Sequence, residues 1–167
     1  MARVIPNSAK LALVLAIGST IALVDQLTKE AAIATLTPNH TVPVLGDILG
    51  WYLTYNDSAA FSIGFGVTWI FTIISSIALL AVLWRTPRIQ TTGWLILAGM
   101  LVGGISGNLI DRLTRAPGFG SGQVVDFIQI PFNFPIFNVA DIFITTTMFT
   151  IALLIIRGHK IGGSQSA

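Results

Sequence analysis

The stretch IQTTGWLILAGMLVGGISGNLI, residues Ile89–Ile110, contains no Asp, Glu, Lys or Arg. A helix needs about 20 mostly apolar residues to cross the hydrocarbon core of a bilayer, so this stretch is long enough to span a membrane. It also carries small residues at spacings of three and four, which let membrane helices approach closely. They are Gly99, Gly103, Gly104, Ser106 and Gly107. The stretch therefore predicts a spanning helix, from about Trp94 to Asp111, at the centre of a bundle.

Three further charge-free stretches occur along the chain: Leu11–Val24, Ser58–Trp84 and Ile142–Ile156. They predict three more spans, the second over about 62–84, and the mean hydropathy of +0.81 agrees with a membrane protein. The first stretch is too short unless its helix continues past Asp25 toward Ala34, and the last helix must begin near Asn138. Asp25 and Asp141 then lie inside membrane helices, where an ionisable side chain is costly and marks a functional candidate.

The basic residues are divided unevenly in a four-span topology. Only Lys29, Arg112 and Arg115 fall on the side where all seven acidic residues lie. The other side holds Arg3, Lys10, Arg85, Arg88, Arg157 and Lys160. Because cytoplasmic loops carry an excess of Lys and Arg, both termini are expected in the cytoplasm and the carboxylates toward the outer face.

The chain is expected to form one membrane domain, residues 1–167, and to be monomeric. The first apolar stretch follows two basic residues, as in a secretory signal peptide, but three later spans favour a retained helix. The Gly- and Ser-rich segment 158–167 predicts a disordered cytoplasmic tail.

Two outer segments remain between the spans. Within them, Ile48–Tyr55 and Gln123–Ile130 are rich in β-branched and aromatic residues and are bounded by turn residues, which predicts short strands. The fold class is therefore an all-α membrane protein with four transmembrane helices and a small extracytoplasmic β-sheet platform. Such a sheet could hold an extended peptide as an added strand.

The residue inventory excludes several kinds of site. The chain has no cysteine and only two histidines, so cysteine nucleophiles and zinc thiolate sites are excluded and histidine-based sites are disfavoured. No metal, cofactor or nucleic-acid partner is expected.

The carboxylates differ in their neighbours. Asp25 has Lys29 at i+4, and Asp111 has Arg112 next to it and Arg115 at i+4, so these read as structural ion pairs as readily as functional groups. Asp126 and Asp141 have no Lys or Arg within ten residues. Two unpaired carboxylates at one membrane boundary suit aspartyl peptide hydrolysis, because one must be ionised and the other protonated. A proton site of a transporter and buried hydrogen-bonding groups remain alternatives.

Five ordered motifs resemble those of the lipoprotein signal peptidase (signal peptidase II) family. They are DQLTK (25–29), NDSAAF (56–61), GNLIDR (107–112), VVDF (124–127) and FNVAD (137–141). The resemblance implies a bacterial inner-membrane aspartyl endopeptidase that removes signal peptides from diacylated prolipoproteins, cutting before the lipidated cysteine. It implies Asp126 and Asp141 as the catalytic pair. It assigns substrate handling or support of the site to Asp25, Lys29, Asn56, Asn108, Asp111, Arg112 and Asn138.

Local spacing supports some of these roles. Asn138 suits an N-cap three residues before Asp141, and Asn108 shares a helix face with Asp111 and Arg112. Ser58 stands where the family usually has Gly, which puts the geometry of that loop in question.

Two rival functions are open. A serine and lysine peptidase would use Lys29 with Ser58, Ser62 or Ser106. A small transporter subunit would use Asp25 or Asp141 as an ion site, although no broken helix or inverted repeat is visible.

Overall fold

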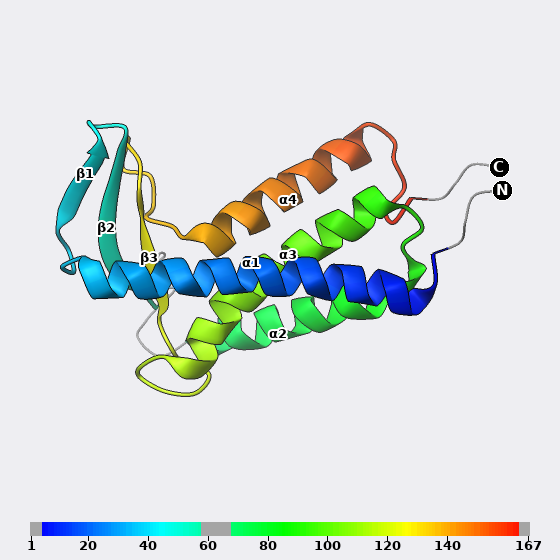
Figure 1. Ribbon diagram of the computed structural model, residues 1–167, viewed down its shortest axis with the longest axis horizontal. Helices are drawn as coiled ribbons and strands as arrows, with labels where there is room; N and C mark the ends of the chain where they lie inside the picture. The colour runs from blue at the N-terminus through cyan, green and yellow to red at the C-terminus, as the bar shows by residue number, and fades with distance from the viewer. Residues whose placement is uncertain (1–4, 58–67, 164–167) are drawn as a thin grey trace.

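The computed structural model describes residues 5–57 and 68–163. Its long helices form a bundle, and a small sheet covers one end of it (Figure 1). The helices are α1 (Asn7–Thr35), α2 (Thr68–Arg85), η2 (Thr86–Arg88), α3 (Thr92–Thr114) and α4 (Val139–Ile156). The strands are β1 (Thr41–Leu45), β2 (Leu49–Asn56) and β3 (Val124–Gln129).

The four predicted spans are confirmed as helices long and apolar enough to cross a membrane. As expected from its length, α1 continues past Asp25 and ends at Thr35. Asn138 caps α4 at its N-terminus, so this helix also begins where the sequence predicted. The predicted start of α2 lies outside the described residues, as does Ser58. Together with the sheet, these helices confirm the predicted fold class.

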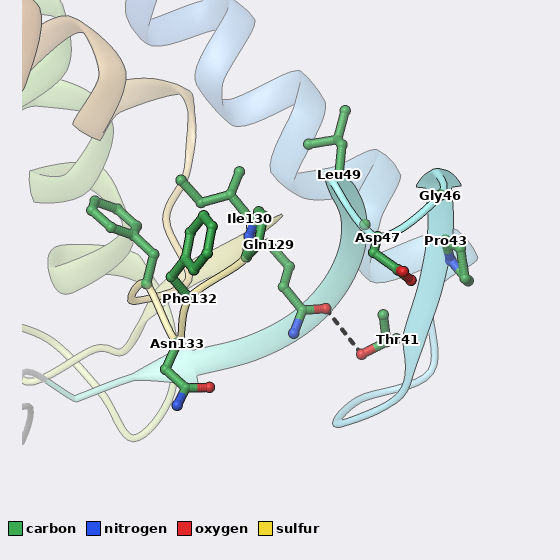
Figure 2. A pocket seen from close by; sticks show the side chains of 12 residues that line it. Thr41, Pro43, Gly46, Asp47, Leu49, Gln129, Ile130, Phe132 and Asn133 are labelled. Carbon is green, nitrogen blue, oxygen red and sulfur yellow. Dashed lines mark hydrogen bonds between the residues drawn. The ribbon is translucent and has the colours of Figure 1, made fainter.

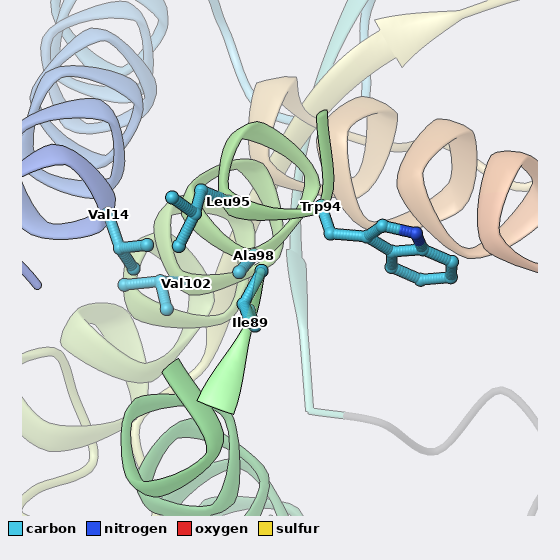
Figure 3. Close-up of a cluster of buried hydrophobic side chains, with 6 residues drawn as sticks. All are labelled: Val14, Ile89, Trp94, Leu95, Ala98 and Val102. Atoms are coloured by element: carbon cyan, nitrogen blue, oxygen red, sulfur yellow. The ribbon is translucent and has the colours of Figure 1, made fainter. Parts of the chain in front are cut away.

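The third span is the central helix of the bundle, as its small residues predicted. In the most apolar part of α3, 67% is buried, and α3 contacts each of the other three long helices. A Cβ added to Gly103 would lie 2.6 Å from the Cβ of Ile21, so α1 can approach α3 only because this position has no side chain. Val14 and Val102 pack in the same interface (Figure 3).

The sheet is antiparallel in the order β1-β2-β3. The two predicted strands are confirmed as β2 and β3, but β1 was not predicted. It is a short, fully exposed segment with Pro43 at its centre, and a proline within a run argues against a strand. The core face of the sheet lies against α1, where Val125 and Phe127 pack with Leu53 and Ala32. This contact holds β3 beside the ends of the membrane helices.

The end of the bundle opposite the sheet carries most of the basic residues. Lys10 donates from Nζ to Pro87 O at 2.9 Å, and so joins the start of α1 to the turn after α2. The segment 158–163 differs from the disordered tail expected there: the backbone N–H of Gln90 donates to Gly162 O at 2.9 Å and fixes this turn at the start of α3.

Candidate active site

Asp126 lies on β3 with only 2% of its surface exposed. Asn56 Nδ2, from the adjacent strand, donates to its Oδ2 at 2.9 Å, and Asn138 Nδ2 donates to its Oδ1 at 2.6 Å. Burial raises the pKa of this carboxyl from 3.8 to about 6, although the two amide donors lower it, and the negative charge of Asp141 raises it further. Asp126 is therefore a carboxyl group that exchanges a proton near neutral pH.

Asp141 is the third residue of α4 and forms a capping box with Asn138. Its backbone N–H donates to Asn138 Oδ1 at 3.0 Å, and its Oδ2 accepts the backbone N–H of Asn138 at 3.2 Å. Asn108 Nδ2, from α3, donates to its Oδ1 at 2.7 Å. The N-cap predicted at Asn138 is confirmed. Because the Asn138 side chain also bonds to the Asp126 carboxylate, one side chain joins Asp126 to the backbone N–H of Asp141.

A buried ionic cluster lies next to this pair. Lys29 Nζ is 2.8 Å from Asp25 Oδ2, 2.8 Å from Asp111 Oδ2 and 3.0 Å from Asn108 Oδ1. The side chains of Lys29, Asp25 and Asp111 are fully buried. The i+4 pairing of Asp25 with Lys29 is confirmed, and so is that of Asp111 with Arg115, at 2.7 Å.

The two cluster carboxylates also bond to the backbone beside the candidate catalytic residues. Asp25 Oδ1 accepts the N–H of Ala140 at 2.8 Å, and Ala140 immediately precedes Asp141. Asp111 Oδ2 accepts the N–H of Val125 at 3.1 Å, and Val125 immediately precedes Asp126. The cluster thus fixes the backbone immediately before Asp141 and Asp126, and so positions their side chains.

The first motif contains a contact that the sequence did not single out. Gln26 Nε2 donates to Asp111 Oδ1 and to Gly107 O, both at 3.0 Å, and so adds a second link between α1 and α3. A Cβ on Gly107 would lie 2.5 Å from Asp25 Oδ2, so this glycine makes room for the cluster. The position of Gln26 next to Asp25 was the available signal, but an amide beside a carboxylate is too common to indicate a site.

Arg112 lies on α3, one turn after Asn108, where α3 meets α2. Its Cζ is 5.8 Å from the ring centroid of Phe71 on α2, and its Nη1 is 3.5 Å from Asn108 O. Its positive charge acts on Asp141, Asp111 and Asp126. The structure therefore brings all nine predicted site residues into one region, at the sheet end of the bundle.

The geometry disfavours a lysine base. A catalytic lysine must offer a neutral amine, but the three hydrogens of Lys29 Nζ are directed at two carboxylates and an amide oxygen. Ser58 and Ser62 lie outside the described residues. Within 5–57 and 68–163, no group of three or more His, Cys, Asp or Glu side chains is placed to hold a metal ion.

A cavity of about 280 Å³ lies farther along β3, between the β1–β2 hairpin and residues 130–134 (Figure 2). Thr41 and Gln129 line it and are joined by a 2.9 Å hydrogen bond. None of the nine predicted site residues lines it. Asp126 and Gln129 are both on β3, three residues apart. The cavity therefore lies at the end of β3 that follows Asp126.

The outer edge of β3 beside Asp126 is already occupied. The N–H of Val125 bonds to Asp111, and the N–H of Phe127 bonds to Phe137 O at 3.0 Å. A peptide added as a strand would have to join β1, which β2 separates from β3. The strand addition predicted for the sheet would therefore have to use the β1 edge and not the edge of β3 beside Asp126.

Comparison with known proteins shows the family to which the chain is similar. A family model described as signal peptidase (SPase) II matches residues 17–157. The chain is 47% identical to a lipoprotein signal peptidase of Leifsonia xyli subsp. xyli, over 86% of this chain and 66% of that protein. It is 37% identical to one of Mycobacterium avium, over 90% of this chain and 82% of that protein.

Two solved structures of bacterial membrane enzymes share the fold. One, at 1.9 Å resolution, has a TM-score of 0.76 and 28% identity and covers 85% of this chain and 91% of that one. The other, at 2.3 Å, has a TM-score of 0.77 and 26% identity and covers 92% and 93%. With four helices able to span a bilayer, the chain is a multi-pass membrane protein.

Proposed function

This chain belongs to the signal peptidase II family, and we propose that it is an aspartyl endopeptidase acting on lipoprotein precursors. Its substrates are diacylglyceryl-modified prolipoproteins, and it removes the signal peptide by cutting before the lipidated cysteine. The observation that carries the proposal is the contact of Asn138 with both Asp126 and Asp141. Within the described residues, neither carboxylate forms an ion pair.

In the proposed reaction the pair shares one proton before the substrate is cut. Asp126 holds it, which is supported by its burial and its pKa of about 6. Asp141 is the more exposed of the two and takes a proton from a water molecule, whose oxygen bonds to the scissile carbonyl carbon. Asp126 gives its proton to the leaving amine as the C–N bond breaks, and one proton again remains on the pair.

The other site residues hold this pair in place. Asn56, Asn108 and Asn138 orient the carboxylate oxygens with their amides. Asp25, Lys29 and Asp111 position the backbone next to the pair. Arg112 adds positive charge that favours an ionised carboxylate during the reaction. No cofactor is required for this chemistry.

The proposed setting is the bacterial inner membrane, with both termini in the cytoplasm and the active site toward the outer face. The start of α1 and the end of α4 lie at the same end of the bundle, and the sheet and the start of α4 lie at the other (Figure 1). Asp126 is on β3 of this sheet, and Asp141 is in the first turn of α4. The excess of basic residues near the start of α1 and the end of α4 supports this orientation. We expect the protein to act as a monomer.

The test is cleavage of a purified diacylated prolipoprotein by Asp126→Asn and Asp141→Asn variants, scored by gel shift. Each substitution should abolish cleavage, because an amide can neither take up nor release the required proton. Asp47→Asn is the matched control, since Asp47 lines the distant cavity, and it should retain full activity. Cleavage by either active-site variant would exclude the two-aspartate mechanism.

A further inference from the structure

An apolar groove lies at the end of the bundle opposite the active site. It has a volume of about 260 Å³ and runs between α2, α3 and α4. Its lining includes Ala81 and Arg85 of α2, Trp94 and Leu101 of α3, Ile151 of α4 and Ile161. The proposed peptidase reaction uses none of these residues.

The bundle forms this groove because small side chains leave space between its helices. Ala81 and Ala98 occupy positions on its walls, and Trp94 points away from the Val14 interface on the other side of α3 (Figure 3). The turn after α4 closes the groove at the membrane boundary, where Gly162 O accepts the N–H of Gln90. The groove is thus part of the fold and is built from three spanning helices and one fixed turn.

Charge complements this apolar lining. Arg85 lines the groove, and within the described residues its guanidinium forms no hydrogen bond or ion pair; its Cζ lies 6.0 Å from the centroid of the Trp84 ring. All seven acidic side chains of the protein lie toward the sheet end or on its loops. The groove therefore combines an apolar channel that borders the lipid with a positive charge that lacks a carboxylate partner.

We propose that this groove binds one phospholipid with an anionic headgroup. Its acyl chain lies along Trp94, Leu101 and Ile151, and its phosphate lies at Arg85. Basic pockets between membrane helices bind anionic headgroups in this way, and two of the helices that form the groove, α2 and α4, are mostly exposed on the surface of the bundle. The site is separate from the one that handles the substrate.

Native mass spectrometry of the purified full chain tests this site, with phosphatidylglycerol and phosphatidylcholine of identical acyl chains added in competition. One basic side chain near an anionic headgroup contributes about 1 kcal/mol, so about fivefold more phosphatidylglycerol should be retained. Arg85→Gln should remove this preference. Arg157→Gln removes the same charge at the same end but outside the groove, and should keep it.

Two further arms distinguish the possible occupants. Ala81→Trp fills the groove from its exposed wall and should release both lipids, while glycerol 3-phosphate, which has no acyl chain, should not bind. Equal retention of the two lipids, or equal effects of Arg85→Gln and Arg157→Gln, would overturn the proposal. So would a dimer mass that disappears on Ala81→Trp, because the groove would then hold a second copy. If Ala81→Trp does not fold, the comparison of Arg85→Gln with Arg157→Gln still tests whether the groove binds the anionic lipid.

Discussion

The side-chain amide of Asn138 donates to Asp126 Oδ1 at 2.6 Å. Among the described residues, this is the shortest hydrogen bond to either candidate catalytic carboxylate. The same side chain accepts the N–H of Asp141 through Oδ1, so a single residue both caps α4 and orients Asp126. These two roles can be separated by substitution, because one uses the oxygen of the amide and the other its nitrogen.

Asn138→Ser should keep the cap and lose the amide donor, whereas Asn138→Ala should lose both. We expect cleavage to fall about 100-fold in each variant, a loss typical of a misplaced reacting group. The amide lowers the pKa of Asp126, the proposed general acid, so both variants should shift the alkaline limb of the kcat/KM profile, where Asp126 loses its proton, to higher pH. Only Asn138→Ala should lose about 1 kcal/mol of folding stability. Unshifted pH profiles in both variants would show that Asn138 acts only as a cap.

Lys29→Met should destabilise the protein strongly, because it leaves the fully buried Asp25 and Asp111 without their shared cation. Breaking a buried ion pair on one side costs about 3 to 5 kcal/mol. Lys10→Met is the control: Lys10 is on the same helix and is also buried, but among the described residues its side chain bonds only to a backbone carbonyl. Thermal denaturation in detergent should show a much larger decrease in Tm for Lys29→Met. Similar decreases would mean that the cluster does not stabilise the bundle.

Asp126 should make stability depend on pH. Its folded pKa of about 6 lies above the ordinary 3.8, so the folded state binds the proton more tightly. The resulting stabilisation is complete below about pH 4 and is lost as the pH rises through about 6. A pKa raised to this extent corresponds to about 3 kcal/mol. The Tm of the wild type relative to Asp126→Asn should therefore decrease between pH 4 and pH 7, and a constant difference would contradict the raised pKa.

Lipidation of the substrate should accelerate cleavage. Asp141 lies in the first turn of α4 and Asp126 lies on β3 at the same end of the bundle, so an acyl-anchored substrate presents its scissile bond at their depth. Each buried CH₂ adds about 0.8 kcal/mol of anchoring, which makes two chains a strong anchor. The diacylated precursor should be cut far faster than the same polypeptide without lipid in one nanodisc preparation. Equal rates would point to a general intramembrane peptidase instead.

The proposed orientation can be tested by labelling, since the chain has no cysteine of its own. A cysteine at His40, which precedes β1, should react with an impermeant thiol reagent in intact cells. A cysteine at Lys160, which follows α4, should react only after the cells are opened. Both positions are exposed, so burial does not explain a difference. The opposite pattern would place the active site in the cytoplasm.

The sequence by itself determined the four spans, because in a bilayer every backbone group must be bonded within its own segment and the length of an uncharged stretch therefore predicts a helix. It also singled out Asp126 and Asp141, since the absence of neighbouring basic residues is a local property. Only the tertiary structure decided that Asp25 and Asp111 hold the backbone beside this pair. The contact of Asp25 with Ala140 joins residues 115 positions apart, and no local pattern records such a contact. The exposed strand β1 was also left to the fold, because its pairing with β2 depends on backbone hydrogen bonds that any side chain allows.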